Sequence, residues 1–190
     1  MRLLPVLAGL LGVLAISACN PFYSVEQSTV ERGYRWIDRG KPEQAISTFE
    51  IALRDYPNSG LAHLGMADAL AEARRYRDAV ATYTKALPLL KTDGHIPSER
   101  IVGSEQTIGK RAFSYQNQGL RVPHGIEAYL YFRRARSYGA LARNDHSQST
   151  SHLAAATADY RRAQVLAPDW KEPGLWVSCL AEPRTVDCPG

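Results

Sequence analysis

The chain has 190 residues, of which 45% are hydrophobic and 22% charged, and its formal net charge is +4. These fractions are close to the averages of globular proteins, so most of the chain is expected to fold as one domain, with or without appendages. The mild charge argues against a dedicated nucleic-acid binder, in which basic residues cluster far more densely.

Residues 1–18 have the composition of a secretory signal. Arg2 is positively charged, residues 3–16 form an apolar run, and Ser17 and Ala18 are small. This order of regions is typical of a signal peptide, which is removed from the mature protein. The apolar run is shorter than the roughly 20 residues of a spanning helix. Because no later segment approaches that length, no transmembrane helix is expected in the mature chain.

The apolar run ends in a four-residue string, Ile16-Ser17-Ala18-Cys19. It resembles the lipobox of bacterial lipoproteins, and the resemblance implies that Cys19 is lipidated and that residues 19–25 form a tether. Two or three acyl chains make a durable anchor. Residue 20 is Asn and not the Asp that favours inner-membrane retention, so the resemblance implies the outer membrane, facing the periplasm. The alternative is an ordinary secretory signal with a chance cysteine.

Local signals next predict two helical hairpins, at about 26–59 and 60–93. The first helix is expected to end at Gly40, and Pro42 suits the first turn of the second. Pro57 ends that second helix, and Asn58 or Ser59 can cap the third. Alanine and bulky residues fall on one face of the second helix at helical spacing.

The two hairpins repeat with a period of 34 residues. Five small or bulky positions recur in register: Gly33 and Ala67, Trp36 and Leu70, Ala45 and Ala79, Phe49 and Tyr83, Ala52 and Ala86. Small residues let the two helices of a hairpin approach closely, and bulky residues fill the space beside them.

This period and its order of residues resemble the tetratricopeptide repeat. The resemblance implies an all-α fold of antiparallel helix hairpins stacked in a short right-handed superhelix, with one long loop insertion. A third repeat is expected at about 126–168, with its first helix from about Ile126 to Arg143. Its second half shows the same slots: Ala156, Tyr160, Ala163 and Pro168. Nine extra residues separate its two halves, and the polar run from 144 to 151 is expected to hold them as a loop.

Residues 91–125 interrupt the array. The 34-residue register fails here, and the segment is rich in Gly and Pro, so it is expected to be an irregular insert. Loops of this length are often functional or disordered, and the sequence does not decide between the two.

Residues 169–190 are expected to cap the last repeat, with a short helix near Pro173 to Leu180. Leu175, Trp176 and Leu180 could cover its exposed face. The tail also holds Cys179 and Cys188, an even pair once Cys19 carries lipid. A structural disulfide is expected, because a redox-active pair usually has the C-x-x-C spacing.

The sequence contains no recognisable catalytic motif, so no enzyme, cofactor or small-molecule substrate is expected. His146 and His152 lie near Asp145 in the polar run, where surface histidines are commoner than metal ligands, and no metal site is expected. His63 is expected to be a packed or groove residue and not a base.

By resemblance, a peptide or helix would bind in the concave groove that the first helices of the repeats line. The groove positions are Val30, Tyr34, Asp38, Leu64, Asp68, Glu72, Tyr129, Phe132 and Arg136. The alternative is that so short an array packs its groove against the insert or the tail.

Charge is uneven along the chain, because residues 100–171 carry 11 Lys or Arg against 5 Asp or Glu. This excess is either a solvated helical face or a basic surface for headgroups, cell-wall polymer or an acidic peptide. The expected function is a lipid-anchored, non-enzymatic adaptor that binds a protein or peptide partner, without nucleic acid, in envelope, pilus or secretion-system assembly. The alternative is a structural cell-envelope protein whose basic half binds polymer or an anionic surface.

Overall fold

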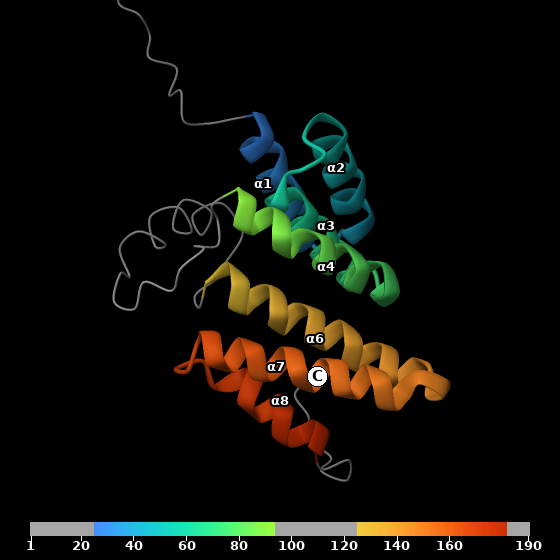
Figure 1. The fold of residues 1–190 in the computed structure, drawn as a ribbon. Coiled ribbons are helices and arrows are strands. Elements are labelled where there is room, and N and C mark those ends of the chain that lie inside the picture. Colours follow the sequence, from blue (N-terminus) through green and yellow to red (C-terminus); the bar gives the residue numbers. More distant parts are fainter. Residues whose placement is uncertain (1–24, 94–124, 182–190) are drawn as a thin grey trace, which may run out of the picture.

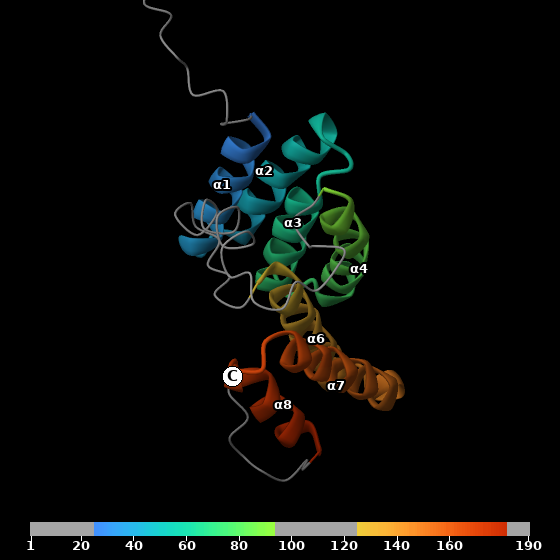
Figure 2. The same cartoon turned by 60° about the vertical axis from the view of Figure 1, so that its left-hand side comes forward.

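The computed structural model describes residues 25–93 and 125–181, and this part of the chain is helical without a strand. Its elements are α1 (Val25–Asp38), α2 (Pro42–Asp55), α3 (Gly60–Glu72), α4 (Tyr76–Thr92), α6 (Ile126–Asn144), the short 3₁₀ helix η1 (His146–Gln148), α7 (Ser149–Leu166) and α8 (Lys171–Ala181). The prediction of an all-α fold built from helix hairpins is confirmed. The hairpins α1–α2, α3–α4 and α6–α7 follow one another in chain order, and α8 packs on α7 at the far end (Figures 1 and 2).

Helix ends fall where the local sequence predicts them. Gly40 has a φ of +67° in the turn before Pro42, a conformation that glycine adopts without steric cost. Ser59 caps α3, because its side-chain oxygen accepts a hydrogen bond from the backbone N–H of Ala62 at 3.1 Å. The turn between α3 and α4 differs, since Arg74 takes the left-handed φ of +60° at the position equivalent to Gly40.

Close packing of small residues holds the hairpins together. Ala45, Ala79 and Ala156 occupy equivalent slots in the three hairpins and are fully buried. The Phe49 ring lies between α1 and α3, where a Cβ added to Gly33 or Gly65 would overlap it. Glycine at these two positions therefore leaves the space that the ring fills.

The third hairpin corrects the prediction of a long polar loop at residues 144–151. α6 extends six residues beyond Tyr138 and α7 begins seven before Ala156, whereas α1 extends two beyond Trp36 and α2 begins three before Ala45. The inserted residues therefore add about one turn to each helix. The connection stays short because a tight 3₁₀ turn makes it, and its polar side chains lie at exposed helix ends.

Aromatic residues of the last helix and of the turn before it cover the third hairpin. Trp176 of α8 stacks on Tyr160 of α7 at 5.7 Å between ring centroids, and Trp170 contacts Phe132 of α6 at 4.5 Å. The prediction that Leu175 helps to cover the repeat is wrong, because its side chain is 58% exposed.

Several predictions lie outside the described residues, among them Cys19, most of the insert at 91–125, and Cys188. Within the described helices, none combines the length and the hydropathy that crossing a bilayer requires.

Candidate functional site

The nine predicted groove residues divide by exposure. Five are buried: Val30, Tyr34, Leu64, Asp68 and Phe132. Tyr129 is half-buried, and three are exposed: Asp38, Glu72 and Arg136. The buried members lie against neighbouring helices, so most of the predicted groove is interior to the repeat stack.

Asp68 is the centre of the buried part. Its carboxylate accepts hydrogen bonds from the hydroxyls of Tyr34 at 3.2 Å, Tyr83 at 2.5 Å and Tyr129 at 3.0 Å. Arg133 donates to the same carboxylate through Nε at 3.0 Å. We call these five residues the Asp68 joint. They come from α1, α3, α4 and α6, so the joint connects all three hairpins.

The Asp68 joint places three neutral hydroxyl donors and the Arg133 guanidinium around one buried carboxylate. Burial and the negative charge of Asp68 raise the pKa of Tyr34, Tyr83 and Tyr129 above the ordinary tyrosine range. The three hydroxyls therefore stay protonated and donate at every physiological pH. Sequence reasoning placed Tyr34, Asp68 and Tyr129 together in a groove, but it did not find Tyr83 or Arg133.

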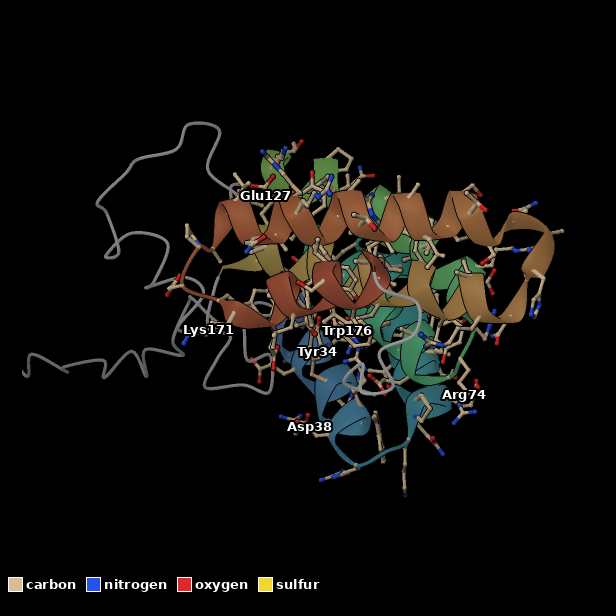
Figure 3. The ribbon with its side chains drawn as sticks, turned by 90° about the horizontal axis from the view of Figure 1, so that it is seen from below. Tyr34, Asp38, Arg74, Glu127, Lys171 and Trp176 are labelled. Carbon is tan, nitrogen blue, oxygen red and sulfur yellow. The ribbon has the colours of Figure 1, made fainter. Side chains whose placement is uncertain are left out.

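An open cleft lies beside the Asp68 joint, between the end of α3, the length of α6, and α7 and α8. Its volume is about 600 Å³, and it runs from Arg74 and Glu72 to Tyr160 and Trp176. Figure 3 labels Arg74 and Trp176, which come from the turn after α3 and from α8. We call this the basic cleft.

The basic cleft carries arginines that are not compensated by acidic neighbours. Arg133 is paired, since its Nη2 donates to Glu72 at 2.8 Å as well as to the joint. Arg74, Arg136 and Arg143 also line the cleft, and none of them forms an ion pair with another described residue. The cleft is therefore positively charged at neutral pH.

Arg134, in the basic half of the chain, binds neighbouring helices and not the cleft. Arg134 of α6 makes two hydrogen bonds to Asp159 of α7, at 2.7 and 2.8 Å, and a third to Thr84 of α4. Because these bonds connect three helices and use both carboxylate oxygens, Arg134 is a packing residue. Of the basic residues between 100 and 171, Arg133 and Arg134 therefore tie helices together, whereas Arg136 and Arg143 line the basic cleft without an ion pair among the described residues.

Tyr160 also lines the basic cleft, and its hydroxyl makes no hydrogen bond to the described residues. Its side chain is 1% exposed, and the hydroxyl has no hydrogen-bond partner among the residues that the structure describes. It occupies the bulky slot that Phe49 and Tyr83 fill in the first two hairpins. The Phe49 ring fills that slot without a hydroxyl, so packing alone does not require one. The sequence does carry a signal for Tyr160, because a hydroxyl stands at a repeat position where the first hairpin has Phe. Sequence reasoning did not identify it.

Three histidines lie within the described residues. His63 is buried, and its Nε2 lies 3.0 Å from the carbonyl oxygen of Pro57, while burial lowers its pKa. His146 is exposed and His152 half-buried at the two ends of the polar turn. No cluster of three or more metal-binding side chains occurs within 25–93 and 125–181.

Comparison with known families agrees with the helix packing. Residues 31–93 match the sequence model of the tetratricopeptide repeat, and this region contains most of the first two hairpins. This part of the chain is therefore similar to tetratricopeptide repeats, which are a non-catalytic protein-interaction fold. No curated protein matches the chain.

Proposed function

We propose that the chain is a lipid-anchored adaptor on the periplasmic side of the outer membrane, where its repeat array binds a protein partner in the basic cleft. The anchor is the Cys19 lipid, and the described helices form a rigid support for the cleft. Catalysis, a cofactor and nucleic acid have no part in this function. Assembly of an envelope structure, a pilus or a secretion system is the setting in which such an adaptor would act.

The basic cleft is the observation that carries the proposal. Surfaces that bind proteins are enriched in Arg and aromatic residues, which supply much of the binding energy at interface centres. Here Arg74, Arg136 and Arg143 line the cleft together with the aromatic residues Tyr160 and Trp176. The Asp68 joint fixes α3 against α6. These two sides of the cleft therefore keep their arrangement when a partner binds. Preorganisation of this kind favours affinity because less conformational entropy is lost.

Binding of cell-wall polymer through the same arginines is the second candidate. The observation that favours it is the positive charge of the cleft, which suits any polyanion. The partly aromatic floor favours a protein, because apolar side chains can enter next to a charged group.

Photo-cross-linking in intact cells tests the proposal. A photoreactive amino acid at Arg143, which lines the basic cleft, should capture a discrete protein. The matched control is Ile51 of α2, which is 42% exposed and lies outside the cleft lining. A product at Arg143 that is absent at Ile51 supports the adaptor. Capture of glycan alone at Arg143 would favour the polymer-binding protein, and equal capture at both positions would contradict a defined site.

A further inference from the structure

The basic cleft contains a buried donor that the described part of the fold leaves without an acceptor. Tyr160 is 1% exposed, and its hydroxyl lacks a partner among the described side chains and backbone groups. An unpaired buried polar group is unfavourable, and native proteins seldom keep one without a reason. Phe fills the equivalent slot in the first hairpin, and the Tyr83 hydroxyl in the second is bonded to Asp68, so among the described residues only the third hairpin leaves a hydroxyl in this slot without an acceptor.

Two arginines without an ion pair among the described residues, Arg136 and Arg143, line the same cleft as Tyr160. Burial raises the pKa of Tyr160, while the positive charges of Arg136 and Arg143 act on it in the opposite direction. The hydroxyl is thus a neutral donor at neutral pH, and both arginines belong to the lining of the cleft that contains Tyr160. One O–H donor beside two guanidinium groups matches the two oxygens of a carboxylate, which accept hydrogen bonds and carry the opposite charge.

The walls of the cleft indicate what carries that carboxylate. Trp176 is 8% exposed, Leu180 is half-buried, and Ala140 lies between the arginines of α6 in the lining. These apolar groups can contact an apolar side chain adjacent to the charge. A membrane surface presents its headgroups on a broad plane, and this plane does not enter a cleft to reach a buried hydroxyl. An extended polypeptide can enter the cleft with a carboxylate side chain, and it can place an apolar side chain next to that carboxylate.

We propose that the basic cleft binds an acidic segment of the protein partner, in which one Asp or Glu side chain accepts a hydrogen bond from the Tyr160 hydroxyl and pairs with Arg136 and Arg143. An apolar residue next to this carboxylate contacts Trp176 and Leu180. The inference rests on the proposed function, because it assigns the chemistry of the partner at the same site.

The left-handed turn at Arg74 supports a recognition role for this rim. A non-glycine residue in that conformation costs about 1 kcal/mol, and such strain is often found at functional sites. The equivalent residue of the first hairpin is Gly40, which avoids the cost. Arg74 therefore brings a guanidinium to the cleft at a position where glycine would be the better backbone choice.

Fluorescence anisotropy with the purified full-length protein in detergent tests the proposal. The probe is a labelled ten-residue peptide with four Asp or Glu and two Leu, blocked at both ends. Its counterpart carries Asn and Gln at the acidic positions. The acidic peptide should bind and the amide peptide should not, and the affinity should fall as salt is added. Tyr160→Phe should weaken binding about tenfold, the range of a hydrogen bond to a charged group.

The variants separate recognition from folding. Tyr160→Phe removes an unpaired hydroxyl, so its thermal midpoint should equal or exceed that of the wild type while its affinity falls. Arg136→Gln and Arg143→Gln should each weaken binding and reduce its salt dependence. Arg161→Gln is the matched control, because Arg161 is exposed on α7 and does not line the cleft. Unchanged affinity in Tyr160→Phe would overturn the proposal.

Other occupants give different results, and each would overturn the proposal. Binding only by a peptide with a free C-terminus would assign the carboxylate to a chain end. Binding only after removal of residues 182–190 would mean that the chain's own tail occupies the cleft. Binding of phosphatidylglycerol vesicles or peptidoglycan that is lost in Arg136→Gln, with no peptide binding, would indicate another class of ligand. A protein cross-linked at Arg143 without acidic-peptide binding would leave the adaptor intact and reject this inference alone.

Discussion

Replacement of Asp68 by alanine removes the acceptor at the centre of the Asp68 joint. The Asp68 side chain is 2% exposed, and it accepts hydrogen bonds from three tyrosine hydroxyls and from Arg133. Removing one partner of a buried ion pair costs about 3–5 kcal/mol, because the other charge is left buried and uncompensated. Arg133 keeps Glu72, which reduces this cost, but each hydroxyl that loses its acceptor adds about 1 kcal/mol. We therefore expect Asp68→Ala to lower the free energy of unfolding by about 3–5 kcal/mol.

Urea titration followed by circular dichroism measures this loss. Asp55→Ala is the control, since the Asp55 side chain is 54% exposed, and it should change stability by no more than about 0.5 kcal/mol. A loss below about 1 kcal/mol for Asp68→Ala would refute the reasoning, because a buried and fully used carboxylate cannot be removed so cheaply. If Asp68→Ala does not fold, a double-mutant cycle of Tyr129→Phe with Asp68→Asn replaces it. Contacting residues should couple by at least about 0.5 kcal/mol, and no coupling would contradict the joint.

Three further predictions concern packing, the anchor and the tail. Ala79→Leu should destabilise by about 1–3 kcal/mol, because it overpacks a fully buried helix contact. Glu43→Gln on the exposed face is the control and should cost less than about 0.5 kcal/mol. Equal denaturant midpoints for the two variants would contradict the packing. Cys19→Ala should abolish metabolic labelling with palmitate and release the chain from membranes, and a wild type that washes off without detergent would contradict the anchor. Non-reduced mass spectrometry should find Cys179 linked to Cys188, and two alkylated thiols at these positions would reject the disulfide.

The hairpins could be predicted from the sequence because their signals are local. Gly40, Pro42 and Ser59 act within one turn of a helix end, and they mark the same ends in the structure. Small residues at a fixed period identify close helix contacts, and Ala45 and Ala79 are fully buried as that pattern predicts. These inferences need only the spacing along the chain.

The third hairpin shows where local signals fail. A polar run such as 144–151 suits either a loop or two exposed helix ends around a tight turn. Asp145 supports the tight turn locally, since its carboxylate accepts a hydrogen bond from the backbone N–H of Ser147 at 3.2 Å. The extra turns of α6 and α7 follow from packing against each other along their length, which composition does not reveal.

The candidate site depended on tertiary structure. Helical periodicity places Tyr34 and Asp68 on the inner faces of their helices, but it does not say whether those faces are open or covered. Burial and pairing depend on what lies opposite a face: α6 covers Asp68 and makes it part of a joint. Likewise the packing of α6, α7 and α8 against one another brings Arg136, Tyr160 and Trp176 to the lining of one cleft. The sequence by itself determined which residues share a helix face. Only the packing of α6, α7 and α8 decided which of these residues remain available to a partner, because desolvation and charge compensation depend on neighbours that are remote along the chain.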